Sequence, residues 1–532
     1  MLVSSADHTA SPPAVTIPRN YNAAHDLLSR NAHRPDKIAY IDAASGEQLS
    51  YGALADQAHR FARGLRAEGF EPESRVLLAM LDTPQWPVVF LGCILAGVVP
   101  VAANTLLTAA DFEFMLRDSR AQGLVASPEL LGALDAGIQS CASLKTVIVA
   151  GNAELPPGLA NSASNRLLAH IIHGPSATKT VANTCADDAC FWLYSSGSTG
   201  LPKGTVHLHS HLIQTAELYG KGVLGITESD VVYSAAKLFF AYGLGNALTF
   251  PMSVGATTVL LPSRPTPASV FDILKTHRPT IFYGVPTLYA SLLADLAKPA
   301  PAELNLRICT SAGEALPAEI GNRWTAQYGC EILDGIGSTE MLHIFLSNRP
   351  GQVRYGTTGQ PVPGYLLRVV DDNGLDCSDG DIGELQISGP SAALMYWNNR
   401  AKTKATFAGE WTKSGDKYTR SADGYYTYGG RSDDMLKVGG IYVSPFEVEA
   451  CLMTHPGVLE VAVVGAEDAD GLIKPKAFVM LKSGHSIGSD ELKAHVKQHL
   501  APYKYPRWIE FVSELPKTAT GKIQRFKLRQ AA

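Results

Sequence analysis

The sequence predicts an α/β protein with a large N-terminal domain of parallel-rich sheets flanked by helices, followed by a small C-terminal α+β domain. The chain of 532 residues is too long for one ordinary core. Over the first several hundred residues, short apolar runs alternate with helical patterns, which favours parallel sheets covered by helices. The composition changes near Tyr428, which indicates a second domain.

The elements of the large domain follow from the apolar pattern. Residues 51–69 carry apolar side chains at helical spacing and end on a glycine, so they predict a helix. Residues 75–80 (RVLLAM) predict a buried strand, and residues 87–96 predict a second, apolar helix. Further short apolar runs predict strands at 145–150, 189–194, 257–261 and 280–283.

The small domain is expected over residues 433–532, after a first domain of residues 1–432. A loop rich in Gly and Asp is expected at 429–440, and a helix at Ser444-Pro445, where proline suits the first turn. Strands at 458–464 and 476–481 and a helix from Ser489 complete an α+β unit of roughly a hundred residues, a common domain size.

Charge and cysteine usage exclude several classes of protein. A formal net charge of −5 without a dense Lys/Arg stripe argues against a nucleic-acid partner. The eight cysteines form no CxxC pair, which favours free thiols over a disulfide frame or a zinc site. The start of the chain lacks a signal-peptide pattern, and the longest apolar stretch, residues 86–103, is interrupted by prolines. We therefore expect a cytoplasmic enzyme that uses no membrane.

The stretch YSSGSTGLPKG, residues 194–204, follows the apolar run at 189–194. A strand that ends in small, hydroxylated residues can turn its N–H groups and hydroxyls toward an anion. The Walker phosphate loop does not fit, because Pro202 precedes Lys203 and Gly204 follows it. An isolated run of this kind is more often a flexible surface loop, so other motifs have to decide.

Five further stretches of the sequence favour a phosphate loop over a flexible surface loop. They are SAGEALP at 311–317, DGIGSTE at 334–340, SGD at 414–416, GRSDDMLK at 430–437 with Gly439-Gly440 behind it, and PKTATGKIQR at 516–525. In this order and at these separations they resemble the adenylate-forming superfamily of acyl-CoA synthetases, peptide-synthetase adenylation domains and beetle luciferases, over nearly the whole chain from about Asn22. The resemblance implies that an acid is joined to AMP with loss of pyrophosphate and then transferred to the thiol of CoA.

The resemblance also implies roles for single residues. Lys522 would act in adenylation, Thr339 would contact the α-phosphate, and Glu340 would hold Mg²⁺ beside the ATP phosphates. The phosphate loop would comprise Ser195, Ser196, Gly197, Ser198, Thr199, Gly200 and Lys203. Adenine and ribose would lie against Ala312, Gly313, Glu314, Asp334, Gly335, Ile336, Asp416 and Arg431. Asp433 would be the hinge of a mobile lid formed by the small domain, and Lys437, Gly439 and Gly440 would lie beside the CoA tunnel.

Simpler interpretations stand beside these roles. Glu340 suits a helix N-terminus, and Asp416 suits an Asx-turn after Gly415. The alternating His207, His209 and His211 resemble a metal comb, but no Cys or carboxylate stands near them in the sequence, which disfavours a metal. Ser195-Ser196-Gly197 lacks the G-x-S-x-G elbow of a serine nucleophile.

The acid is expected near KLFFAYGLG, residues 237–245. This stretch holds no Asp or Glu, so the ammonium of an α-amino acid would be buried unpaired. The implied pocket is Ala241, Tyr242, Ala312, Gly337, His343 and Ile344, although His343 equally suits a core histidine. GIGSTEMLHIFLSN together with FFAYGLGN resembles the benzoate–CoA ligase branch of the superfamily.

Alternatives from other classes remain open. They are a ligase for hydroxy- or aminobenzoate or for medium-chain fatty acids, a module that loads a carrier protein in trans, and a non-catalytic nucleotide-binding regulator, which would be expected to lose Lys522 or Glu340. The expected partners are a small aromatic carboxylic acid, ATP and CoA, and a homodimer is compatible with the sequence.

Overall fold

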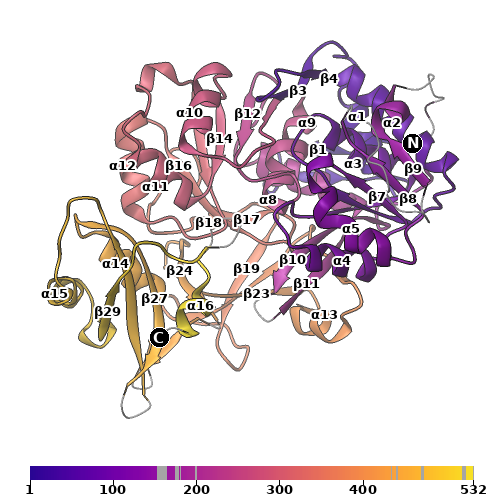
Figure 1. Cartoon of the computed structure of the whole chain (residues 1–532). Coiled ribbons are helices and arrows are strands. Elements are labelled where there is room, and N and C mark those ends of the chain that lie inside the picture. The colour runs from indigo at the N-terminus through magenta and orange to yellow at the C-terminus, as the bar shows by residue number, and fades with distance from the viewer. Residues whose placement is uncertain are drawn as a thin grey trace.

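The structure is a computed structural model that describes residues 1–151, 164–173, 179, 181–197, 200–432, 434–438, 441–468, 472–517 and 523–530. Figure 1 shows a large N-terminal part of sheets and helices and a small C-terminal part, coloured orange to yellow, at its lower left. This arrangement confirms the predicted α/β class with a large and a small domain.

A nine-stranded sheet forms one half of the large domain. Its six central strands, from β16 to β3, pair in parallel, whereas the strands at both ends pair antiparallel. In spatial order the strands are β18 (Gln360–Pro361), β17 (Ile344–Ser347), β16 (Ile332–Gly337), β15 (Ile308–Ser311), β14 (Ile281–Gly284), β12 (Val231–Ser234), β13 (Thr257–Leu260), β3 (Ile38–Asp42) and β4 (Gln48–Ser50).

An eight-stranded sheet forms the other half. Its strands from β10 to β9 pair in parallel, and an antiparallel pair is added beyond β10. In spatial order they are β21 (Met395–Tyr396), β11 (Gly200–Leu208), β10 (Ala189–Gly197), β6 (Val99–Ala102), β5 (Arg75–Ala79), β7 (Gly123–Ala126), β8 (Thr146–Val149) and β9 (Ser164–Leu167). The predicted strands at 75–80, 145–150 and 189–194 all lie in this sheet.

A third sheet of the large domain is antiparallel and was not predicted. It consists of β19 (Leu366–Val370), β20 (Ile382–Ser388), β23 (Trp411–Arg420), β22 (Phe407–Ala408) and β24 (Tyr426–Arg431). Separately, β1 (Ser5–Asp7) and β2 (Ala14–Thr16) form a hairpin near the N-terminus.

The helices of the large domain follow the predicted alternation. α2 (Tyr51–Ala67) begins where the Ser50 hydroxyl accepts a hydrogen bond from Ala53 N. Its apolar face, from which the helix is predicted, packs against α3 (Gln85–Ala96), which is buried along nearly its whole length. The helices are α1 (Ala23–Ser29), α2 (Tyr51–Ala67), α3 (Gln85–Ala96), α4 (Ala109–Asp118), α5 (Leu131–Ser140), α6 (Leu168–Ile172), α7 (His209–Thr215), α8 (Ala241–Leu244), α9 (Phe250–Val254), α10 (Pro267–Thr276), α11 (Pro286–Ala294), α12 (Ala318–Tyr328) and α13 (Arg400–Thr406).

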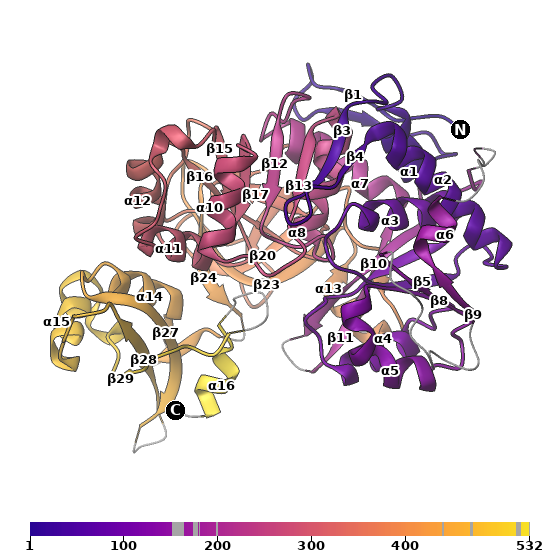
Figure 2. The same ribbon diagram turned by 45° about the horizontal axis from the view of Figure 1, so that its top comes forward.

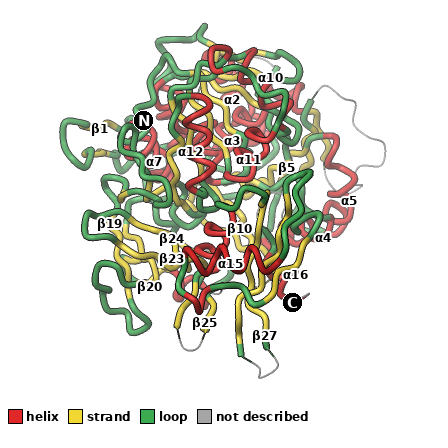
Figure 3. The backbone as a smooth tube through the Cα atoms, turned by 90° about the vertical axis from the view of Figure 1, so that its left-hand side faces the viewer, coloured by secondary structure: helices red, strands yellow, loops and turns green. Residues whose placement is uncertain are grey.

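The small domain has its own core and its own three-stranded sheet. Its elements are β25 (Leu436–Val438), β26 (Ile441–Val443), α14 (Pro445–Met453), β27 (Val458–Glu467), β28 (Ile473–Leu481), α15 (Ser489–His499), β29 (Trp508–Phe511) and α16 (Arg525–Gln530). Figure 2 shows them grouped on one side of the molecule, and Figure 3 shows α12 of the large domain above α15 of the small domain.

The predicted loop at 429–440 is partly wrong. Residues 429–431 end β24, and residues 436–438 form β25. Gly429 and Gly430 obscure the end of β24, because they carry no side chain that would reveal a pleated, half-buried pattern. β25 contains no glycine, but its three residues are too few to show a pattern. Among the described residues, no helix combines the length and apolar character needed to span a membrane.

A charged cluster fixes the starts of three central strands. The guanidinium of Arg307 donates to both carboxylate oxygens of Asp230, at 2.8 and 2.7 Å, and the Thr280 hydroxyl donates to the same carboxylate at 2.6 Å. These residues immediately precede β15, β12 and β14. Burial tends to raise the pKa of Asp230, but the hydrogen bonds from Arg307 and Thr280 outweigh it and hold that pKa below its ordinary value.

We predict that Arg307→Met lowers the free energy of unfolding by about 2 kcal/mol near neutral pH. A fully buried pair would cost roughly 3–5 kcal/mol, but the Arg307 side chain is 38% exposed. The pKa of Asp230 is lowered in the folded chain. The cluster therefore stabilises the fold fully above the ordinary aspartate pKa, and this contribution is lost as the pH falls from there through the lowered pKa. Urea unfolding at several pH values measures this, and Arg420→Met, in an exposed ion pair with Asp379, is the control. A pH-independent loss would contradict the prediction.

Candidate active site

The predicted phosphate loop is the tip of a β-hairpin. β10 pairs antiparallel with β11, so that Ser195 lies opposite Lys203 and Gly197 opposite Gly200. The Ser195 hydroxyl is buried and has no hydrogen-bond partner among the described residues. Ser198 and Thr199 lie outside the described residues. The hairpin therefore brings the predicted loop residues on both strands to one end of the eight-stranded sheet, and it leaves a buried hydroxyl for a ligand.

Tyr396, which belongs to none of the sequence motifs, connects Lys203 with Glu340. The Lys203 ammonium lies 4.8 Å from the centre of the Tyr396 ring, and the Tyr396 hydroxyl donates to Glu340 Oε1 at 2.6 Å. Burial lowers the pKa of Lys203, while the Glu340 carboxylate acts against this shift. Tyr396 lies in β21, which pairs with β11, the strand that carries Lys203. This pairing brings Lys203 close to Glu340, although the two residues are far apart in the chain.

The three alternating histidines serve the scaffold. The His207 side chain donates from Nε2 to the carbonyl of Thr339 at 2.8 Å, which fixes the backbone beside Glu340, and its Nδ1 lies 3.0 Å from Nδ1 of His211. His209 Nδ1 accepts from the backbone of Ala23 at 3.1 Å. Burial lowers the pKa of His207 and of His209 to about 4, so both are neutral at physiological pH.

The two motifs assigned to adenine meet at the ends of neighbouring strands. β15 and β16 pair in parallel with Ser311 opposite Asp334, so residues 312–314 and 334–336 lie at the same edge of the sheet. Gly313 has φ of +92°, which favours glycine. Burial raises the pKa of Asp334 well above its ordinary value, and its Oδ1 atom has no partner among the described residues. This edge of the sheet therefore offers buried polar atoms to a ligand.

Asp416 and Arg431 form a pair across β23 and β24. They lie opposite each other in the antiparallel register, and Arg431 Nη1 donates to Asp416 Oδ1 at 3.1 Å. The Asp416 backbone N–H donates to the Ser414 hydroxyl at 3.0 Å. The turn is therefore held by Ser414, and the Asp416 carboxylate is directed at Arg431 instead of capping its own turn.

The small domain contacts the large domain at the SAGEALP motif and at Tyr428 of β24. The backbone N–H of Ile523 donates to Glu314 Oε1 at 3.3 Å, and the rings of Tyr428 and Phe446 meet at 5.4 Å between centres. Ile523 directly follows Lys522, which lies outside the described residues together with Asp433, Gly439 and Gly440. Lys437 lies in β25. The structure thus brings the segment next to Lys522 onto the SAGEALP motif.

Two of the residues predicted for the acid pocket, Tyr242 and Gly337, lie against a third, His343. The His343 ring contacts Tyr242 and Phe250, with centroids 5.6 and 4.5 Å away, and the Tyr242 hydroxyl shares a 2.5 Å hydrogen bond with Thr310 Oγ1. A Cβ added to Gly337 would approach the His343 carbonyl to 2.6 Å, so only glycine fits there. Ala241, Ala312 and Ile344 belong to the same core.

Asn246, which belongs to none of the sequence motifs, helps to set the orientation of His343. Its Nε2 lies 3.2 Å from the Tyr242 carbonyl and 3.2 Å from Asn246 Oδ1. A carbonyl can only accept, so Nε2 carries the proton and Nδ1 keeps the lone pair. Burial lowers the pKa of His343 to about 3, so the ring is neutral. Nδ1 is buried without a partner among the described residues, as is the hydroxyl of Tyr283.

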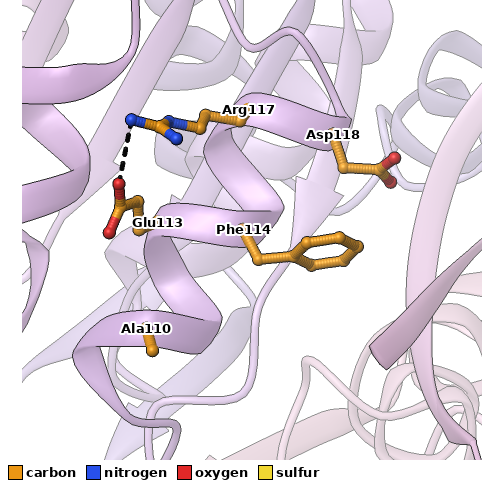
Figure 4. Close-up of a pocket in the computed structure, with 5 residues that line it drawn as sticks. All are labelled: Ala110, Glu113, Phe114, Arg117 and Asp118. Carbon is orange, nitrogen blue, oxygen red and sulfur yellow. Dashed lines mark ion pairs between the residues drawn. The ribbon is translucent and has the colours of Figure 1, made fainter. Parts of the chain in front are cut away.

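One cavity lies elsewhere. A hollow of about 520 Å³ runs along α4 and is lined by Ala110, Glu113, Phe114, Arg117 and Asp118, with Glu113 and Arg117 paired at 3.0 Å (Figure 4). None of the predicted site residues lines it. Asp118 connects it to the hairpin of β10 and β11, because its carboxylate accepts from the Tyr194 hydroxyl at 2.7 Å.

Comparisons with known proteins agree with this geometry. Residues 28–397 match the family of AMP-binding enzymes, and residues 447–522 match the C-terminal domain of that family. A benzoate–CoA ligase of Thauera aromatica is 59% identical over 99% of both chains. A 4-hydroxybenzoate–CoA/benzoate–CoA ligase of Rhodopseudomonas palustris is 50% identical over 96% of this chain and 94% of the relative. The crystal structure of a benzoate CoA ligase from Burkholderia xenovorans superposes with a TM-score of 0.88 at 56% identity, over 96% of this chain and 100% of the other.

The tyrosine that holds Glu340 gives a testable prediction. Tyr396→Phe removes one hydrogen bond to the carboxylate and keeps the ring, so the carboxylate loses its fixed orientation. A hydrogen bond to a charged group contributes about 1.5–3 kcal/mol. We expect affinity for ATP with Mg²⁺ to fall about tenfold, and affinity without Mg²⁺ to stay unchanged.

Calorimetric titration with and without Mg²⁺ measures this effect. Tyr425→Phe, which alters an exposed hydroxyl bonded to the Gln352 carbonyl, is the matched control. An equal loss with and without Mg²⁺ would show that Tyr396 does not act through Glu340.

Proposed function

The chain belongs to the AMP-binding enzymes, and from this premise we propose that it is a benzoate–CoA ligase. The observation that carries the proposal is the match in sequence to a benzoate–CoA ligase over 99% of both chains, together with a neutral, aromatic pocket around His343. The enzyme joins benzoate to AMP, releases pyrophosphate, and then forms benzoyl-CoA and AMP. It requires ATP and CoA as substrates, and we place it in the cytoplasm, where both are available.

The two half-reactions place different demands on the site. In the first, a carboxylate oxygen attacks the α-phosphorus and pyrophosphate leaves, so negative charge must be stabilised on both sides of that atom. Lys203, Thr339 and the hairpin around Ser195 are proposed to hold the phosphates. In the second, the CoA thiolate attacks the acyl carbon and AMP leaves, which requires room for the thiol where pyrophosphate was.

The Glu340 side chain is suited to be a ligand of Mg²⁺. One of its oxygens accepts the Tyr396 hydroxyl, which orients the carboxylate so that the other oxygen can bind a hard cation. Bound Mg²⁺ would neutralise charge on the phosphates of ATP. The ribose hydroxyls are proposed to donate to Asp416, which Arg431 orients, and adenine is proposed to lie between residues 312–314 and 334–336.

The pocket favours an uncharged aromatic ring. His343 is neutral, and residues 237–245 hold no carboxylate that could pair with an ammonium. The pocket also disfavours a fatty acyl chain, because His343 Nδ1 and the Tyr283 hydroxyl are buried polar atoms without partners among the described residues. An apolar tunnel would not contain such atoms. A compact planar acid therefore fits better than a long aliphatic one.

Transfer between the half-reactions is proposed to use a rotation of the small domain, residues 433–532, about Asp433. Lys522 would reach the reacting carboxylate in the first orientation, and Lys437, Gly439 and Gly440 would line the CoA tunnel in the second. The contact between Ile523 and Glu314 supports the first orientation for this structure. Such rotations separate two chemistries in one site.

We predict that Lys522→Ala abolishes adenylation and spares thioester formation from supplied benzoyl-adenylate. The lid would present this lysine only in the first orientation. ATP–pyrophosphate exchange and single-turnover thioester formation measure the two steps separately. Lys517→Ala, which removes a lysine of the same segment paired with Glu460 at 2.8 Å, is the control and should leave both steps intact. An equal loss of both half-reactions in Lys522→Ala would contradict the assignment.

We predict that benzoate is the best substrate, that small ortho or meta groups are tolerated, and that para groups are penalised. A clash of one small group in an apolar pocket costs roughly 1–3 kcal/mol, or about 10–200-fold in kcat/KM. His343→Ala should recover some para-substituted acids at the expense of benzoate, with the KM for ATP unchanged. A panel of aromatic, aliphatic and amino acids in the exchange assay measures this. If octanoate or 4-hydroxybenzoate outruns benzoate in the unmodified enzyme, the choice of benzoate is wrong although the ligase assignment would stand.

A further inference from the structure

A second cluster of metal-binding side chains lies in the small domain, outside the site described above. Cys451 from α14 and His495 and His499 from α15 each place one ligand atom within 4.8 Å of the others. The Cys451 side chain is buried, His495 is half-buried and His499 is exposed, so the group opens to solvent on one side. We propose that these three residues form a binding site for a divalent transition-metal ion of the zinc class.

Hydrogen bonds set the protonation of both imidazoles. The Thr454 hydroxyl donates its only proton to the Cys451 carbonyl at 2.7 Å, so its oxygen accepts from His495 Nε2 at 2.8 Å. His499 Nδ1 lies 2.8 Å from the His495 carbonyl and must donate to it. The remaining nitrogens, Nδ1 of His495 and Nε2 of His499, therefore carry lone pairs. Histidines that ligate metals are usually held in this way, with the second nitrogen bonded to a carbonyl or carboxylate.

A further histidine supports the cluster from the side. His455 packs edge-on against the His495 ring at 5.3 Å between centres. Its own nitrogens are engaged, because Nδ1 accepts from Gly457 N at 3.3 Å and Nε2 lies 3.4 Å from Glu491 Oε1. His455 therefore restricts the His495 ring and leaves the ligand set at three residues.

The ligand set selects the metal. One thiolate and two imidazoles suit Zn²⁺, with the fourth tetrahedral position open to water, and disfavour Mg²⁺ and Ca²⁺, which prefer oxygen. Binding would release the proton of the Cys451 thiol. The spacing of the cysteines does not reveal the site, because the ligands come from two helices separated by a pair of strands. α15 lies at the outer edge of the small domain in Figures 1 and 2.

Cobalt is the probe for this site, because Co²⁺ bound to a thiolate absorbs in the near ultraviolet and a tetrahedral ion absorbs in the visible. The full-length chain is freed of metal with a chelator and titrated with Co²⁺. We expect one Co²⁺ per chain with both absorptions, and displacement by Zn²⁺. Cys451→Ser should abolish the thiolate absorption. His499→Ala should weaken binding by at least the ~10–100-fold that loss of an outer-shell partner costs.

Matched controls separate the site from chance binding. Cys377→Ser removes a half-buried cysteine of the large domain, and His485→Ala removes an exposed histidine of the small domain. Both should bind Co²⁺ like the parent chain. Thermal unfolding without metal checks that each variant is folded. A Co²⁺ spectrum without a thiolate band, or an equal band in Cys451→Ser, would overturn the proposal.

Discussion

The parallel pairing of β15 with β16 is the constraint on which the site depends. Their register sets Ser311 opposite Asp334, and because strands in parallel end at the same edge, two motifs that are separate in the sequence become neighbours. Thr310, the residue before Ser311, shares a hydrogen bond with the Tyr242 hydroxyl, and Glu314 accepts one from the backbone of Ile523 in the small domain. Ser311 and Asp334 therefore share a face, and a slip of one residue would turn their side chains to opposite faces of the sheet.

Burial, more than net charge, determines how the site's polar groups behave. The same effect that keeps His343 and His207 neutral lowers the pKa of Lys203 and raises that of Asp334. Each group then depends on a few neighbours for its orientation. His207 bonds to the backbone carbonyl of Thr339. The Tyr242 carbonyl and Asn246 orient His343. Residues of the scaffold thus position two proposed site residues through a few hydrogen bonds.

The sequence predicts the parts whose signal is local. The helix predicted over residues 51–69 and the strands β5, β8, β10, β13 and β14 follow from apolar runs and periodicity, and the motif order predicts which loops belong to the site. The antiparallel sheet of β19, β20 and β22–β24 was missed, since its strands carry charged and polar residues on one face. Tyr396 and Asn246 could not be predicted either, because their roles exist only once distant strands and helices pack. The assignment of 429–440 to a loop failed because glycine is common to turns and to closely packed strands.

The position of Arg431 couples two events that look separate. Arg431 ends β24, the last strand of the large domain, and the chain leaves it directly for the small domain. Arg431 thus orients the Asp416 carboxylate, the proposed ligand of the ribose, and it also borders the connection between the two domains. Thermodynamic linkage makes any such coupling reciprocal, so the factor by which nucleotide favours one lid orientation equals the factor by which that orientation tightens nucleotide binding. For the proposed lid, release of AMP and reopening would then be two sides of one equilibrium.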